Sequence, residues 1–424
     1  MRLAQALWAT LARAGVAQLY GRPLAGLPVV AMASQQASLA ARAHQRVYLE
    51  RAAAHLGGGR LWLPPTWPAG GPGASVVLGG PEDLGPLEEA VSGGGEVELV
   101  VAADLASPGR PPPGAGEPAG PAAPGDQVLE AVGRADRVAV LAGPGVLSGG
   151  GLAGLHQLAA AGGLGVLNTW GAKGVFDWRS HHHWATTGLQ RDDFALGGLA
   201  EVELVLACGL DQLESPPERL ALAPTLEVEP AALAPLAEAW PHPRGSPLPP
   251  PPLRERLGRV TQAGWGRRGT PLAPSRVTLA YSRILGPRGL VAAEPGTAGF
   301  WVARTLPTTG VGSVQVPADA SVPGLAAACC LVARLRQPAR AVLCACDSPV
   351  TEEVLAVVEQ ARSLGVELAV EAWGVEGPAL GPEEHEARLA AVAVGAEGGL
   401  LAMATDPGQM EEVLDAAGPV VAWR

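Results

Sequence analysis

Residues 166–176 read Val-Leu-Asn-Thr-Trp-Gly-Ala-Lys-Gly-Val-Phe and contain the only asparagine of the chain, Asn168, and its only lysine, Lys173. Elsewhere the 424 residues are dominated by Ala, Gly, Pro, Leu, Val and Arg. Such a vocabulary is typical of a strongly GC-biased genome, which replaces lysine by arginine and removes asparagine wherever that is tolerated. Chance proximity of two single residues is the alternative. We interpret the stretch as a place where side-chain identity matters.

The sequence on either side of this stretch alternates strand and helix patterns, which is typical of a parallel sheet flanked by helices. The predicted strands of this middle segment are Arg137–Leu141, Gly165–Thr169, Leu204–Ala207 and Thr225–Val228, with a helix at Leu152–Ala161. The first strand ends in a Gly143-Pro-Gly145 turn, where small residues let a phosphate approach a helix N-terminus. Gly143, Gly145, Asn168 and Lys173 are candidate nucleotide contacts, although a glycine-rich turn of this kind more often reflects plain turn chemistry.

Two stretches rich in proline divide the chain. We predict linkers at 110–126 and 241–274, which leave segments 1–109, 127–240 and 275–424, each within the size range of one domain. In the first segment we predict helices at Leu3–Ala14 and Ser34–His55 and strands at Leu27–Ala33, Ser75–Leu78 and Val97–Ala102. In the last segment we predict strands at Gly289–Ala293, Ala341–Cys346 and Glu367–Glu371 and helices at Leu325–Leu335 and Glu352–Leu364. The sequence predicts an α/β protein of three successive parallel-sheet domains.

Composition narrows the classes of partner. The net charge of −11 argues against nucleic acid and against an anionic membrane surface, and 48% hydrophobic residues suffice for a sizeable core. We see no signal peptide and no uncharged apolar run of membrane-spanning length, and expect a cytoplasmic protein.

The five cysteines lack zinc-site spacing and are expected to be buried thiols.

Four motifs of the middle segment carry a resemblance to a known family. They are Leu141-Ala-Gly-Pro-Gly145, the stretch 166–176, Gly188-Leu-Gln-Arg-Asp-Asp193 and Ala207-Cys-Gly-Leu-Asp211. Together they resemble the central domain of thiamine-diphosphate-dependent enzymes of the acetolactate synthase, pyruvate oxidase and decarboxylase group. The resemblance implies a shortened pyrimidine-binding domain at 1–109, a Rossmann-like central domain at 127–240 and a diphosphate-binding domain at 275–424.

The resemblance also implies a magnesium site in the last domain, where the family has a Gly-Asp-Gly turn and a later asparagine. Here the turn reads Cys346-Asp347-Ser348, and no asparagine follows. Asp347 is the candidate metal ligand, with Glu371 as a further source of oxygen; the alternative for Asp347 is a cap at the strand end. Ser348, Gly296 and Gly324 are further candidate coenzyme contacts.

In this family a glutamate of the first domain activates the coenzyme by a hydrogen bond to its aminopyrimidine ring. Glu50 is the candidate for that role. The alternative is that Gln35 or Gln36 occupies the position, and glutamine cannot exchange the proton.

A histidine run, His181-His-His183, suggests a metal site, but adjacent residues rarely converge on one ion, and we expect a solvated loop.

These observations leave three functional hypotheses. The first is a thiamine-diphosphate family protein with an eroded coenzyme and magnesium site and a non-catalytic or weakly active role. The second is an active decarboxylase or carboligase of a 2-oxo acid. The third is a nucleotide-binding module working through the central domain, which in some relatives binds a flavin nucleotide. The family resemblance implies a homodimer or tetramer and a small-molecule ligand.

Overall fold

The computed structural model describes residues 19–21, 29–31, 74–78, 97–101, 125–241, 249–394 and 398–423. The chain divides into two compact units, Met1–Val47 with His55–Gly120 and Tyr48–Ala54 with Pro121–Arg424. In the first unit, strands β1 (Leu19–Gly21) and β2 (Val29–Ala31) pair in parallel, as do β3 (Ala74–Leu78) and β4 (Val97–Val101). A full parallel sheet in this segment stays a prediction.

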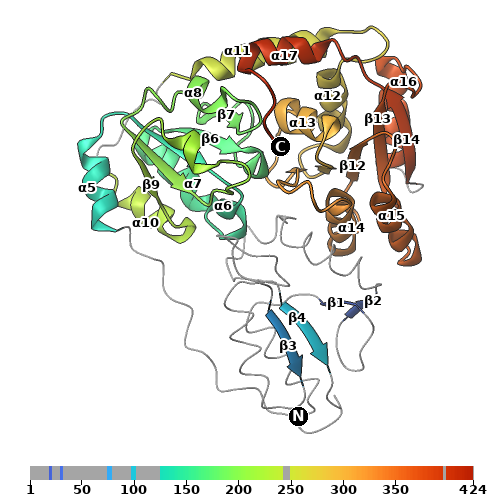
Figure 1. The fold of residues 1–424 in the computed structure, drawn as a ribbon, viewed down its shortest axis with the longest axis horizontal. Helices are drawn as coiled ribbons and strands as arrows, with labels where there is room; N and C mark the ends of the chain where they lie inside the picture. Colours follow the sequence, from blue (N-terminus) through green and yellow to red (C-terminus); the bar gives the residue numbers. More distant parts are fainter. Residues whose placement is uncertain are drawn as a thin grey trace. The chain divides into compact units, whose positions relative to one another are not determined.

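The second unit contains two five-stranded parallel sheets (Figure 1). The central sheet has the order β7-β6-β5-β8-β9. Its strands are β5 (Val138–Ala142), β6 (Gly165–Thr169), β7 (His183–Thr187), β8 (Leu204–Cys208) and β9 (Thr225–Glu227). Every residue of β5, β6 and β8 is buried, as expected of parallel strands covered on both faces.

Alternate residues of the central strands enter two different cores. Val138 and Val140 of β5 pack with helices α7 (Leu152–Gly162) and α10 (Leu233–Glu238) on one face. Ala139 and Leu141 point to the other face and belong to a core cluster that continues into the last domain. This period of two places the central sheet between its own helices and the last domain.

The last domain has the strand order β11-β10-β12-β13-β14. Its strands are β10 (Leu290–Ala293), β11 (Val314–Gln315), β12 (Val342–Asp347), β13 (Ala369–Gly374) and β14 (Gly399–Ala404). The helices between them are α13 (Thr297–Thr305), α14 (Leu325–Arg336), α15 (Glu352–Ser363) and α16 (Pro382–Ala393). Helix α12 (Pro274–Leu285) precedes the first strand, and α17 (Gln409–Ala417) follows the last. The α/β class with parallel sheets is thus confirmed for two domains.

Several elements differ from the sequence-based expectation. Helix α11 (Pro252–Gly266) occupies 15 residues of the range 241–274 that was expected to be linker. Pro252 stands at its first turn, where a missing N–H costs nothing. Helix α5 (Asp126–Arg134) begins at the end of the other expected linker. The expectation of a solvated loop at His181–His183 is wrong in part, because His183 begins β7 and is half-buried. None of the helices in the described ranges is long and apolar enough to cross a membrane.

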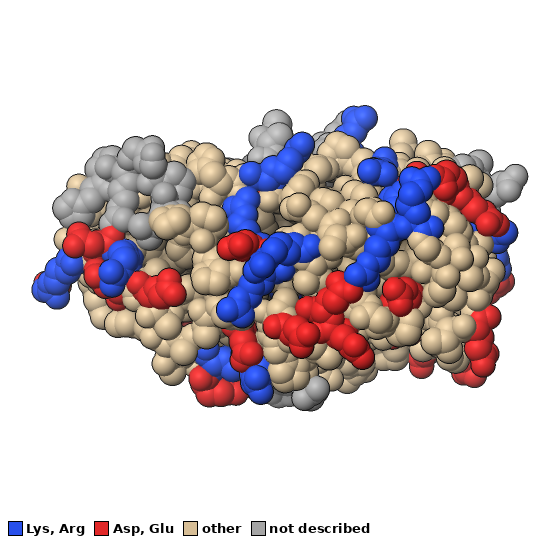
Figure 2. Space-filling model, turned by 90° about the horizontal axis from the view of Figure 1, so that it is seen from above, with Lys and Arg blue, Asp and Glu red and all other residues tan. Residues whose placement is uncertain are grey.

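Helix α11 lies along α17 (Figure 1). The surface seen in Figure 2 carries interspersed basic and acidic side chains. Ion pairs among the described residues include Arg268 with Glu383 and Arg276 with Glu386. Charges of both signs alternate on that face, and the expected absence of a nucleic-acid partner stays a prediction.

Candidate functional site

Asp347 lies at the carboxyl end of β12 and caps a neighbouring helix. Its Oδ2 accepts a hydrogen bond from the backbone N–H of Thr297 and its Oδ1 one from that of Ala298, each at 2.8 Å. Both donors belong to the first turn of α13. Gly296, the residue before this helix, has φ +140°, and a Cβ there would collide with Asp347 Oδ2. The carboxylate therefore satisfies amides that the helix cannot satisfy itself.

Glu294 makes the same kind of contact one strand away and was not singled out from the sequence. It follows β10, and its carboxylate accepts hydrogen bonds from the backbone N–H groups of Gly324 at 3.1 Å, Ala326 at 2.9 Å and Ala327 at 3.3 Å. Burial raises the pKa of Glu294 to about 7, although these amides favour the charged form. The signal in the sequence is a glutamate directly after an apolar strand and two residues before a glycine.

Ser348 follows Asp347 and is exposed, and its backbone N–H donates to the carbonyl of Trp373 at 2.7 Å. Gly324 precedes α14 with φ +82°, a left-handed backbone that favours glycine. The structure thus brings four predicted residues, Asp347, Ser348, Gly296 and Gly324, to one edge of the last sheet.

Glu371 lies in the core and not at this edge, which corrects the expectation that it supplies a metal ligand. Its Oε1 accepts from the hydroxyl of Tyr281 and from Nε1 of Trp373, the latter at 2.9 Å, and its Oε2 lies 2.9 Å from Nε2 of His385. Its side chain is fully buried. Burial and the adjacent Glu371 raise the pKa of Tyr281. The carboxylate joins β13 to α12 and α16 as part of an interior polar network.

Gly143 and Gly145 serve close backbone packing. The N–H of Gly143 donates to the carbonyl of Cys208 and that of Gly145 to the carbonyl of Gly209, both at 2.8 Å. A Cβ on either glycine would collide with the backbone of Gly209. Their amides are therefore engaged within the protein, and the helix that follows, α6 (Gly145–Ser148), is only four residues long.

Asn168 and Lys173 are both buried in the central domain, away from the edge that carries Asp347. Nδ2 of Asn168 donates to the carbonyl of Thr169 at 2.9 Å and to Oγ1 of Thr186 at 3.2 Å, which ties β6 to β7. Lys173 is 6% exposed, and in the described part of the chain its amine has no hydrogen bond or ion pair. Burial, and secondarily the charge of Arg304, lower its pKa to about 7.

Arg304 of α13 joins the two sheets by a buried ion pair that sequence reasoning missed. Its NH1 donates to the carbonyl of Thr186, and its NH2 donates to both oxygens of Asp193, at 3.0 and 2.8 Å. Both side chains are fully buried. Burial raises the pKa of Asp193, and Arg304 partly offsets this effect.

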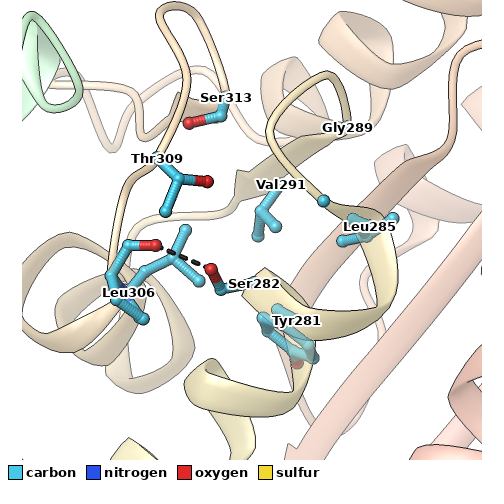
Figure 3. Close-up of a pocket in the computed structure, with 10 residues that line it drawn as sticks. Tyr281, Ser282, Leu285, Gly289, Val291, Leu306, Thr309 and Ser313 are labelled. Atoms are coloured by element: carbon cyan, nitrogen blue, oxygen red, sulfur yellow. Dashed lines mark hydrogen bonds between the residues drawn. The ribbon is translucent and has the colours of Figure 1, made fainter. Parts of the chain in front are cut away.

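A small cavity lies between the end of α12 and the segment 306–313 (Figure 3). Ser282 and Thr309 are among the residues that line it, and Oγ of Ser282 donates to the carbonyl of Pro307 at 2.8 Å. Its volume is about 10 Å³. It therefore has room for about one water and none for a coenzyme.

The magnesium expected from the resemblance does not fit the residues that the structure describes. Asp347 and Glu371 each use both oxygens within the protein, and nowhere in the described ranges do three or more Asp, Glu, His or Cys side chains form a group that could hold a metal ion. The candidates for the coenzyme-activating residue, Glu50, Gln35 and Gln36, lie outside the described residues.

Comparison with known families finds one match. Residues 126–225 match the family model described as the central domain of thiamine pyrophosphate enzymes. The matched range runs from the first residue of α5 to the first residue of β9. No curated protein matches the chain. The match confirms, for residues 126–225, the resemblance to the central domain of thiamine-diphosphate enzymes.

Proposed function

Because residues 126–225 form a thiamine pyrophosphate enzyme central domain, we propose that the chain is an acetolactate synthase-like member of that superfamily whose coenzyme and magnesium site is eroded. Its role is then non-catalytic or weakly active: it keeps the fold and works as a binding or partner protein. A homodimer or tetramer is the proposed assembly, since apolar burial between subunits does not require the coenzyme.

The use of Asp347 carries this proposal. Magnesium demands several oxygen ligands in near-ideal octahedral geometry, and proteins supply them from one or two carboxylates. Both oxygens of Asp347, the aspartate that the resemblance offers, already accept hydrogen bonds from the N–H groups of Thr297 and Ala298 at 2.8 Å. A magnesium ion bound to Asp347 would compete with these two hydrogen bonds, and in the described ranges no group of three or more Asp, Glu, His or Cys side chains offers it further ligands.

A titration of the purified chain with thiamine diphosphate tests the proposal. Calorimetry and circular dichroism of the coenzyme are recorded with and without Mg²⁺, on the wild type and on Asp347→Asn. We expect no saturable, magnesium-dependent binding by either protein. Saturable binding by the wild type that Asp347→Asn abolishes would instead support an active decarboxylase or carboligase with Asp347 as metal ligand.

The nucleotide-binding alternative keeps one observation in its favour. Oδ1 of Asn168, at the carboxyl end of β6, is buried and finds no hydrogen-bond partner among the described residues. Ligands of open α/β sheets bind at such strand ends. Flavin absorbance in the purified protein, lost in Asn168→Ala, would favour this alternative over the first.

A further inference from the structure

Two helix N-termini at the edge of the last sheet are each closed by a carboxylate of the chain itself. We propose that Glu294 and Asp347 are internal anions that take the place of a diphosphate and exclude it from the first turns of α14 and α13. This inference rests on the proposed function and extends it from the metal to the anion.

The two carboxylates leave neighbouring strands at the same edge. Ala293 of β10 is in register with Ala345 of β12, and the N–H of Glu294 donates to the carbonyl of Ala345 at 2.9 Å. From these adjacent positions each side chain reaches a different helix. Glu294 accepts hydrogen bonds from three backbone N–H groups around the start of α14, and Asp347 accepts two from the start of α13.

The backbone at both helix starts is shaped for a close anion. The residues that precede α13 and α14 are glycines with left-handed backbone, Gly296 and Gly324. At Gly296 a side chain would collide with the carboxylate of Asp347, so the glycine makes the contact possible. Exposed N–H groups at helix starts attract phosphate and carboxylate alike. Here carboxylates already hold them.

A diphosphate could use these amides only by displacing a carboxylate. Until displacement, the ligand and the carboxylate would compete for the same N–H groups while their negative charges repel each other at short range. Glu294 is the stronger barrier of the two because it is 8% exposed and holds three donors. Neutralising both side chains removes the repulsion and keeps one acceptor oxygen each for the helix amides.

Inorganic pyrophosphate without a metal is the probe. Its binding is measured by calorimetry and by thermal shift on the wild type, Glu294→Gln, Asp347→Asn and the double variant. Glu353→Gln is the matched control: Glu353 lies beside Gly324 and contributes to the raised pKa of Glu294, yet holds none of these amides. We expect no saturable binding by the wild type or the control, and saturable binding by the double variant, whose Kd is then at least about tenfold below the highest pyrophosphate concentration that the titration reaches.

Two results would overturn the inference. One is saturable pyrophosphate binding by the wild type, since the helix ends would then be open. The other is a double variant that shows the far-ultraviolet spectrum of the wild type and gains no affinity. A different result would contradict the proposed function, namely magnesium-dependent binding of thiamine diphosphate to the wild type.

Discussion

Replacing Lys173 by methionine should stabilise the protein and remove part of its pH dependence. The lysine is 6% exposed, and its pKa falls from 10.5 to about 7. A change of that size corresponds to about 4–5 kcal/mol of free energy that disfavours the charged amine in the folded state. Methionine fills a similar volume without an ionisable group, so we expect a gain of roughly 2–4 kcal/mol at neutral pH.

The sign of the pH dependence follows from proton counting. Between a pH of about 7 and 10.5 the unfolded chain holds a proton on Lys173 that the folded chain has released. Stability of the wild type therefore rises with pH across this window, and the full penalty is present below it. Because Lys173 is the only lysine, the variant should lose the whole lysine contribution to this slope.

Urea unfolding followed by circular dichroism at several pH values across this window measures both effects. Arg179→Met is a suitable control, because this exposed arginine pairs with Asp177 at the surface. It should leave the slope unchanged. Reductive methylation with ¹³C gives one side-chain lysine signal, whose titration reports the pKa directly. A midpoint near 10.5, or a variant less stable than the wild type at neutral pH, would refute the reasoning.

Three further changes test other contacts. Arg304→Met leaves Asp193 buried without its partner and should cost about 3–5 kcal/mol in urea unfolding. Gly296→Ala forces a side chain against Asp347 in left-handed backbone and should lower stability by about 1–3 kcal/mol, read as a lower thermal midpoint. In the folded state the pKa of Glu294 is about 7, above its ordinary 4.5, so its protonated form favours folding at low pH and this contribution is lost as pH rises through about 7. The free energy of unfolding should therefore change less between pH 4.5 and 7 in Glu294→Gln than in the wild type. An unchanged pH profile would contradict the raised pKa.

The strand pattern was readable from the sequence because parallel strands buried on both faces are short, continuous apolar runs. The expected strand Gly165–Thr169 coincides with β6, and Leu325–Leu335 differs from α14 by one residue. Four short motifs of the middle segment carried the family resemblance, which the match at 126–225 confirms for that part of the chain. Helix α11 was missed because a proline cluster precedes it, and proline at a first turn starts a helix as readily as it ends one.

The sequence by itself determined the α/β class, the central domain and the list of polar residues worth placing. Only the tertiary structure decided what those residues do. Asp347 reaches the amide of Thr297, 50 positions earlier, and Arg304 meets Asp193 across 111 positions. A strand is specified by its neighbours in sequence, but the partner of a carboxylate is specified by which helix start the folded sheet brings beside it. For this reason the sequence left Asp347 open as a metal ligand or a cap at the strand end, and only the fold shows its carboxylate at the first turn of α13.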